Sequence, residues 1–391
     1  MERTDLTAQP LSFCPVIPPA GEPQPVTQDK EGNVWVNIRA DHASRVAMRI
    51  YEEEYPFEKG DDGIWHLKYP FRDGIVYVQL LIDGMEVMTP YLPVCYGYSR
   101  PYNCIMLEET EERYDVPEGE SGAAELAGTV DFYRLKDVPH GAVRREYYFS
   151  SVTGEWESAL VYTPPGYDEN TDRVYPVLYL QHGHGENEMG WTAAGKVNFI
   201  LDNLIAEGKA VPFLVIMNNG MVQTAAGERR RVVDHTLFSE LLMKDIIPWA
   251  QSRFRIGEGK EYRAMAGLSM GSIQTAVTTF TYPEYFSYVG IFSGFLHDFI
   301  QGHGQMDMIR RGPSENAHLK ALDDPEKFRK DFRVFFRGIG KSDPFLDYFT
   351  EDEKLLEEKG VSCVKKMYEG AHDWNVWRRC IRDFAQLIFK V

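Results

Sequence analysis

The stretch Tyr262-Arg-Ala-Met-Ala-Gly267-Leu-Ser269-Met-Gly271-Ser-Ile-Gln-Thr-Ala-Val277 decides the fold. Its first five residues are typical of a buried strand, and the residues after Gly271 are typical of a helix. A Gly-x-Ser-x-Gly pattern at such a junction places its serine on a sharp, strained turn, because the two glycines let strand and helix approach closely. The helix N-terminus also favours negative charge at the serine. The stretch therefore predicts that Ser269 is a nucleophile presented at the end of a strand.

Around this stretch, short apolar strands alternate with amphipathic helical segments, among them residues 196–207 and 239–253. Continuous apolar strands are typical of a sheet that is covered on both faces. The pattern predicts an α/β domain over residues 131–391, with a mostly parallel central sheet flanked by helices. The expected strands include residues 158–162, 175–180, 212–217, 262–266, 288–292 and 332–336.

The front of the chain follows a different pattern. Residues 1–25 are rich in proline and polar groups, which indicates an extended lead. From 26 to 110, short stretches of alternating polarity are separated by turn signals, which predicts a small antiparallel β-sandwich. Residues 111–130 are acidic and glycine-rich, so we expect a solvated linker there.

The composition excludes several classes of partner. The 391 residues carry a formal net charge of −17, and a negative field repels nucleic acid and anionic membrane surfaces. No stretch approaches the roughly 18 apolar residues that span a bilayer. We expect a substrate that is neutral or cationic overall. The sequence leaves open whether the chain forms a homo-oligomer.

The cysteines and the first residues bear on location. Five cysteines are scattered without Cys-x-x-Cys spacing, which favours buried free thiols over a zinc site or a disulfide framework. Cys95 and Cys104 could still pair in an oxidising compartment. The first residues lack a basic start followed by an apolar stretch, so no secretory signal is expected in the chain as given. A cytoplasmic protein is predicted, or a secreted or periplasmic one if a signal was removed.

A serine nucleophile needs a base, which α/β enzymes of this kind supply from a histidine later in the chain. His372 follows the strand-like residues 361–368, and a loop after the last strand is where the base belongs. His297 and His303 flank an aspartate in a glycine-containing loop, and His318 is expected at the surface of a polar helix. We assign His372 as the general base and then the general acid.

The acid of the same chemistry is expected at Asp343. It follows the strand at 332–336, so its carboxylate should project from the carboxyl edge of the sheet, where ligand sites of open α/β sheets lie. Its role would be to hold the tautomer of the base and stabilise the imidazolium. Asp347 in the same loop is the rival, and Asp373 is a weaker candidate. The alternative interpretation is that Asp343 initiates an Asp-Pro turn or caps a helix.

Acyl transfer also needs donors for the oxyanion, and one should be the backbone N–H of Met270. The other is expected from the glycine-containing loop after residue 180, with the amide of His184 first and that of Gly185 next. His182 and His184 could instead suggest a metal pair, but no matching carboxylate or cysteine cluster accompanies them. His182 is expected to pin the loop by hydrogen bonds.

Four tryptophans are candidates for ligand contact. Trp191 lies near the oxyanion loop and Trp374 near the base, so each could wall a substrate-binding pocket or simply pack. Trp35 and Trp65 in the front domain could bind glycans, although their strand-like surroundings also fit its core.

With these residues in place, the chain from Asp131 to Val391 resembles the esterase family that includes feruloyl esterases, acetylxylan esterases, enterochelin esterase and the mycolyltransferases. The front domain resembles the immunoglobulin-like modules, related to glycogen-binding domains, that precede such esterases. The matching segments are Tyr162-Thr-Pro-Pro-Gly-Tyr, Tyr175-Pro-Val-Leu-Tyr-Leu-Gln-His-Gly-His-Gly, Gly267-Leu-Ser-Met-Gly, Gly340-Lys-Ser-Asp343 and Gly370-Ala-His372-Asp-Trp-Asn-Val-Trp-Arg, with Asp61-Asp-Gly-Ile-Trp65 and Ile82-Asp-Gly-Met in the front domain.

The resemblance implies an α/β-hydrolase fold and a triad of Ser269, Asp343 and His372, without metal or organic cofactor. It does not fix the substrate, because relatives act on different esters on the same scaffold. Our hypothesis is hydrolysis of an ester on plant cell-wall carbohydrate in the manner of a feruloyl esterase, with acetylxylan, another acyl sugar or an enterochelin-type siderophore as alternative substrates. An acyltransferase and a non-catalytic carbohydrate-binding protein are the competing classes. Two departures from the family pattern are Ser272, where many relatives carry glycine, and Pro344, where an aromatic is usual.

Overall fold

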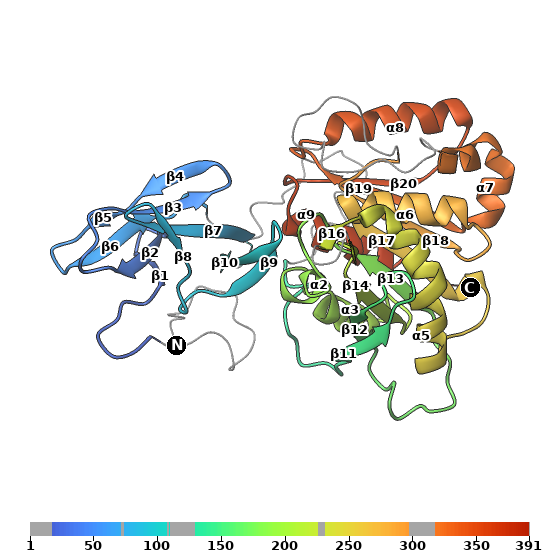
Figure 1. The fold of residues 1–391 in the computed structure, drawn as a ribbon, viewed down its shortest axis with the longest axis horizontal. Helices are drawn as coiled ribbons and strands as arrows, with labels where there is room; N and C mark the ends of the chain where they lie inside the picture. The colour runs from blue at the N-terminus through green and yellow to red at the C-terminus, as the bar shows by residue number, and fades with distance from the viewer. Residues whose placement is uncertain are drawn as a thin grey trace. The chain divides into compact units, whose positions relative to one another are not determined.

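The computed structural model describes residues 18–71, 74–107, 109, 130–225, 231–296 and 317–390. The chain divides into two compact units, Met1–Asp131 and Phe132–Val391 (Figure 1). The expected lead is described from residue 18 onward, whereas nearly all of the expected linker lies outside the described residues.

The described part of the first unit is built from antiparallel strands. They form one sheet in the order β1-β2-β6-β5 and another in the order β4-β3-β7-β10-β9, with β8 paired to β7. Residues of both sheets share one core, which includes Val36, Met48 and Ile105. The strands are β1 Val26–Gln28, β2 Val34–Arg39, β3 Val46–Ile50, β4 Glu53–Pro56, β5 Glu58–Lys59, β6 Ile64–Lys68, β7 Gly74–Ile82, β8 Met85–Val87, β9 Val94–Gly97 and β10 Arg100–Leu107.

Two tryptophans and two cysteines that the sequence analysis singled out lie in this unit. Trp65 is buried in the shared core, and its Nε1 donates to the carbonyl of Ala40, while Trp35 is half-buried and donates to Asp29. Cys95 and Cys104 lie on neighbouring strands, both buried, with their Sγ atoms 2.9 Å apart and no disulfide between them. The packing explains Trp65 without a ligand.

The second unit contains an eight-stranded sheet in the order β11-β12-β14-β13-β17-β18-β19-β20 (Figure 1). The pairs β11–β12 and β12–β14 are antiparallel, and all others are parallel. The strands are β11 Ala142–Phe149, β12 Trp156–Thr163, β13 Val177–Gln181, β14 Leu214–Asn218, β17 Arg263–Leu268, β18 Tyr288–Phe292, β19 Val334–Gly340 and β20 Val364–Tyr368, beside a separate ribbon of β15 Gln223–Ala225 and β16 Arg231–Val233.

Helices cover both faces of this sheet. On one face, α4, α5 and α6 pack on the strands, followed by α7 and α8, and on the other lie α2, α3 and α9 (Figure 1). The helices are α2 Gly190–Ala193, α3 Val197–Ala206, α4 Phe238–Leu241, α5 Ile247–Arg253, α6 Met270–Thr281, α7 Pro325–Asp331, α8 Leu346–Lys359 and α9 Trp374–Ala385, with a π-helical segment Leu242–Ile246 and short 3-10 turns at His235–Leu237, Lys260–Tyr262 and Ala317–Asp323.

The sequence pattern predicted most of these elements. Each expected strand overlaps an observed one, and the expected helices at 196–207 and 239–253 are α3 and the run from α4 through α5. The pattern missed β11, whose sequence Ala-Val-Arg-Arg-Glu-Tyr-Tyr-Phe is too polar to suggest a strand. As an edge strand with one exposed face, β11 does not need a continuous apolar run.

Among the described helices, none combines the length and the apolar character that crossing a bilayer requires.

Candidate active site

Ser269 occupies the sharp turn between β17 and α6. Its backbone has φ 51° and ψ −120°, a conformation that costs free energy for a residue with a side chain. A Cβ on Gly267 would lie 2.3 Å from the carbonyl oxygen of Gly271, and a Cβ on Gly271 would lie 2.5 Å from that of His182. Only glycines fit at these two positions, so the expected reason for the Gly-x-Ser-x-Gly pattern is confirmed.

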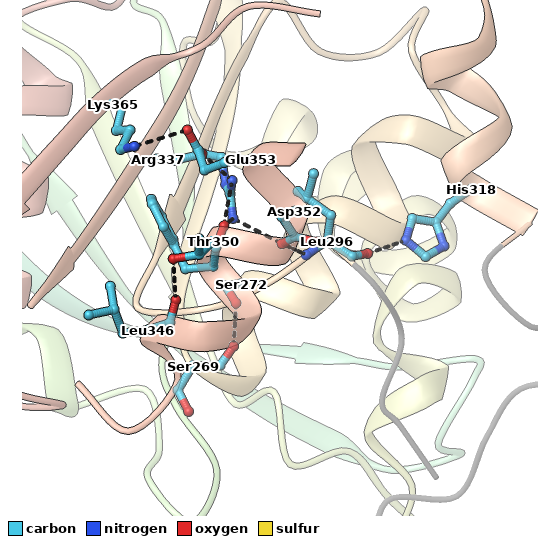
Figure 2. Close-up of polar contacts among 11 residues, drawn as sticks. Ser269, Ser272, Leu296, His318, Arg337, Leu346, Thr350, Asp352, Glu353 and Lys365 are labelled. Atoms are coloured by element: carbon cyan, nitrogen blue, oxygen red, sulfur yellow. Dashed lines mark hydrogen bonds and ion pairs between the residues drawn. The ribbon is translucent and has the colours of Figure 1, made fainter. Parts of the chain in front are cut away.

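The departure at Ser272 is accommodated locally. Its buried hydroxyl donates to the carbonyl of Ser269 at 2.5 Å (Figure 2). A Cβ on Gly294 would lie 1.6 Å from the Ser272 Oγ. The absence of a side chain at Gly294 therefore makes room for the serine hydroxyl, which in turn tethers the strained backbone of Ser269.

Asp343 and His372 meet at the carboxyl edge of the same sheet. The carboxylate lies in the loop between β19 and α8, and Nδ1 of the His372 ring lies 3.0 Å from Oδ2 and 3.2 Å from Oδ1. An ionised carboxylate only accepts, so Nδ1 donates and Nε2 is left as the basic nitrogen. The Asp343 side chain is fully buried, whereas 23% of the His372 side chain is exposed.

Backbone hydrogen bonds join the loops that carry these residues. The amide of Ser269, just after β17, donates to the carbonyl of Phe292, the last residue of β18. The amide of Ser293 donates to the carbonyl of Gly338 on β19. The amide of Ser342 then donates to the carbonyl of Gly370, two residues before His372. The segments that follow β17, β18, β19 and β20 are thus fixed to one another in the order of their strands.

Pro344 leaves the acid in place. The amide of Phe345 donates to Oδ1 of Asp343 at 2.9 Å and closes a tight turn around the proline. The ring of Phe345 then contacts the His372 ring edge-on, with centroids 4.9 Å apart, and Trp377 contacts it at 5.1 Å. Phe345 thus places an aromatic ring one residue later than the family pattern has one, and sequence reasoning missed the contacts of both rings.

The pKa of Asp343 is lowered from its ordinary value. Burial acts to raise it, but the hydrogen bond and charge of His372 and the amide of Phe345 outweigh that effect. Asp343 therefore stays ionised near neutrality, as a residue that orients the base requires.

The rival acids have other surroundings. Asp347 is exposed in the first turn of α8. Among the contacts of the described residues, none joins Asp347 to His372. Asp373 caps α9, where its side chain accepts from the amides of Asn375 and Val376. The geometry supports Asp343 as the partner of the base.

The loop between β13 and α2 approaches the serine. A Cβ on Gly183 would lie 3.4 Å from the Cβ of Ser269. The amide of Gly183 donates to Glu186, and that of Gly185 donates to the sulfur of Met221. Within the described chain the His184 amide has no acceptor, and Met270, as the first residue of α6, has no intrahelical one. Neither amide is committed to an acceptor among the described residues, so both are candidate donors to an oxyanion.

His182 holds this loop through both ring nitrogens. Nδ1 donates to the carbonyl of Gly183 at 2.8 Å, and Nε2 accepts from the amide of Gly220 at 2.8 Å. Burial lowers the pKa of His182 to about 4, since protonation would also cost the bond from Gly220. The expected structural role is confirmed, and a ring with both nitrogens occupied by backbone is no metal ligand.

The two tryptophans near the site are buried. Trp191 donates through Nε1 to the carbonyl of Gln181 at 2.9 Å, and its ring packs edge-on against Trp374 with centroids 5.2 Å apart. Burial favours the packing alternative over direct contact with substrate. Trp374 in turn packs against Trp377, the ring beside the base.

The expectation for His318 is wrong. The residue is buried, and its Nε2 bonds the carbonyl of Leu296 at 2.7 Å, because the short helix that carries it packs on α6. His297 and His303, the other two histidines compared with His372, lie outside the described residues.

A buried ion-pair cluster, which the sequence analysis missed, joins β19 to α8 (Figure 2). Arg337 on β19 pairs with Asp352 at 2.9 Å and with Glu353, both on α8, and neither Arg337 nor Asp352 has an exposed side chain. Asp352 also accepts from the amide of Leu296 at 2.7 Å. An arginine within the apolar run of β19 was the available signal, because a buried guanidinium requires partners.

Known proteins resemble this chain in sequence and in structure. A family model described as "Putative esterase" matches residues 150–384. An endo-1,4-β-xylanase/feruloyl esterase of Xylanibacter ruminicola is 32% identical over 340 residues, which are 85% of this chain and 41% of the relative. The chain thus spans less than half of that relative's length.

Two solved structures share the fold. A ferulic acid esterase of Anaeromyces mucronatus matches with a TM-score of 0.55 and 22% identity, over 66% of this chain and 95% of that one. The enterobactin esterase of Shigella flexneri matches with a TM-score of 0.56 and 13% identity, over 90% of this chain and 92% of that one.

The sheet order, the strained turn at Ser269 and these structural matches define an α/β-hydrolase, which confirms the predicted fold. Since the family model covers more than half of the chain, the chain belongs to the Esterase family.

Proposed function

We propose that the chain is a serine carboxylesterase that releases feruloyl groups from plant cell-wall carbohydrate. The observation that carries the proposal is the 3.0 Å pair of Asp343 and His372 at the sheet edge where the strained turn presents Ser269. The same constellation serves acyl transfer on several unrelated folds.

In the first half of the reaction, Nε2 of His372 takes the proton of the Ser269 hydroxyl as Oγ attacks the ester carbonyl carbon. The amides of Met270 and His184 donate to the oxyanion that forms. The bond from the carbonyl carbon to the alcohol oxygen then breaks, and His372 gives its proton to the leaving alcohol. Ser269 now carries the acyl group.

In the second half, water replaces the alcohol. His372 takes a proton from the water as its oxygen attacks the acyl carbon, and returns that proton to Ser269 Oγ as the acid leaves. Asp343 keeps its negative charge and stabilises the imidazolium in both halves. The chain's own residues supply each proton transfer, so no cofactor is required.

The feruloyl preference rests on the names of the relatives. The Xylanibacter ruminicola protein combines a xylanase and a feruloyl esterase in its name, and the Anaeromyces mucronatus structure is a ferulic acid esterase. A net charge of −17 also fits a neutral polysaccharide as the carrier of the ester.

The test is the rate of methyl ferulate hydrolysis by the wild type and by Ser269→Ala. We expect measurable turnover by the wild type and a loss of about 10⁵-fold or more in kcat for the variant, since the nucleophile is removed. Equal turnover by both proteins would refute the mechanism. Faster release of acetate from acetylated xylo-oligosaccharide than of ferulate would refute the feruloyl preference alone.

A further inference from the structure

Three large aromatic side chains are exposed on one face of the β11–β12 hairpin. Tyr147 is 61% exposed, Phe149 is 58% exposed and Trp156 is 70% exposed. Strand alternation places Tyr147 and Phe149 on the same face, and Phe149 is paired with Trp156 across the hairpin, with ring centroids 5.9 Å apart. Tyr148 points to the opposite face, where it is buried against Trp249. Such a cluster of exposed aromatics indicates an interaction site.

The register of the sheet brings this cluster to the edge that carries the candidate active site. Ala159 on β12 is paired with Asn218, the last residue of β14, so Trp156 lies beyond the carboxyl end of the neighbouring strand. Ser269 follows β17 at the same edge. Three strand spacings separate β12 from β17, roughly 14 Å at the usual distance between strands (Figure 1).

A buried carboxylate ties the hairpin to the loop that approaches the serine. Oε1 of Glu188 accepts from Nη1 of Arg145 on β11 and from Oγ of Ser158 on β12, each at 2.9 Å. Ser158 is paired with Tyr147, so these bonds lie directly beside the aromatic cluster. Glu188 belongs to the same loop as His184, whose amide is the proposed second donor to the oxyanion. The cluster is therefore fixed relative to the catalytic loop.

We propose that Tyr147, Phe149 and Trp156 form a distal subsite for the neutral glycan chain that carries the ester. Aromatic rings present flat apolar surfaces, and the C–H faces of pyranose rings pack on them while the hydroxyls stay in water. A short oligosaccharide spans the separation from Ser269. The proposal rests on the proposed function, because it assigns the sugar part of that same substrate.

The charge of the chain favours this occupant over a second copy. Two molecules with a net charge of −17 repel each other, whereas a neutral glycan meets no such barrier. Pairing of β11 with another strand would use its backbone edge and leave the aromatic face uncovered.

The test compares a small ester with a polymeric one. For Trp156→Ala and for the triple variant with Tyr147→Ala and Phe149→Ala, we expect kcat/KM for methyl ferulate to stay within about twofold. For ferulate bound to arabinoxylan, we expect KM to rise roughly tenfold, because only that substrate reaches the subsite. Val174→Ala is the matched control, since Val174 is 52% exposed and precedes the opposite, amino end of β13. Equal losses on both substrates, or no loss on arabinoxylan, would overturn the subsite.

A binding measurement separates this proposal from the catalytic one. Ser269→Ala protein should be retarded in a gel that contains arabinoxylan, and the added Trp156→Ala should remove most of that retardation. Retardation that does not depend on Trp156 would overturn the subsite, as would a sedimentation change showing that Trp156→Ala splits a dimer. Failure of Ser269→Ala to abolish ester hydrolysis would refute the mechanism and leave the binding result standing.

Discussion

Two buried aspartates, nine positions apart, behave differently because of their partners. Asp343 faces the imidazole of His372, which reaches the surface, whereas Asp352 faces the guanidinium of Arg337, which is fully enclosed. A base that must gain and lose a proton needs access to substrate, but an arginine keeps its charge and can be sealed in. The buried carboxylate of Asp343 thus supports proton transfer by His372, whereas that of Asp352 joins α8 to β19 through Arg337.

Of the substitutions that test this comparison, Asp343→Asn gives the largest expected effect. The amide can present its N–H₂ to Nδ1 and favour the wrong tautomer of His372, so kcat for methyl ferulate should fall about 10³- to 10⁴-fold. Thermal unfolding should shift little, because the amide has nearly the same shape. A loss of activity below tenfold in steady-state kinetics would mean that Asp343 does not orient the base.

Arg337→Met is expected to act on stability instead. It leaves Asp352 buried without its cation, which should lower the free energy of unfolding by about 3–5 kcal/mol in urea denaturation. The folded fraction should keep its kcat, since Arg337 contacts α8 and not the base.

A second substitution sharpens this comparison. Adding Asp352→Asn should recover part of the loss, because the neutral amide still offers an acceptor to the amide of Leu296. The exposed pair of Lys359 and Asp323 is the control, and Lys359→Met should cost less than about 1 kcal/mol. An Arg337→Met protein as stable as the wild type would contradict a joining role for the cluster.

His182 offers a third case, a buried titratable group without a charged partner. Its folded-state pKa of about 4 lies below the ordinary 6.5. Between these pH values His182 is protonated in the unfolded chain but neutral in the folded chain. The stability that this group contributes above pH 6.5 should therefore be lost as the pH falls toward 4. The loss should total about 3 kcal/mol.

Urea denaturation of the wild type and of His182→Gln across this pH range checks that expectation. The variant should lose most of the slope, while His42→Gln, at an exposed position of the other unit, should keep it. Equal slopes in wild type and His182→Gln would contradict the assignment of His182 as a neutral buried donor and acceptor.

Asp347→Asn gives the smallest expected effect. Asp347 is exposed in the first turn of α8, so kcat and KM for methyl ferulate should stay within about twofold of the wild type. A loss comparable to that of Asp343→Asn would reverse the choice between the two acids.

The sequence predicted what local pattern controls. The strained turn at Ser269 depends on residues within a few positions of it, and the strand that precedes it is continuous and apolar. The structural role of His182 also followed from its glycine-containing loop. Strands with a continuous apolar run or a clear alternation of polarity were found, whereas the polar edge strand β11 was not.

Long-range contacts lay beyond such patterns. The choice between Asp343 and Asp347 depends on where the loop after β20 brings His372, 29 positions away from Asp343. The burial of His318 depends on the packing of its helix against α6, and the partners of Arg337 depend on which face of α8 meets β19. The pattern of polar and apolar residues along the chain does not reveal any of these long-range contacts.

The most direct test of the acyl-enzyme is mass spectrometry of protein quenched during turnover of 4-nitrophenyl ferulate. Proteolysis should yield a peptide containing Ser269 that is heavier by one feruloyl group, and this species should be absent from Ser269→Ala. Turnover that continues with the feruloyl group on another residue, or with no acylated peptide in the wild type, would contradict Ser269 as the nucleophile.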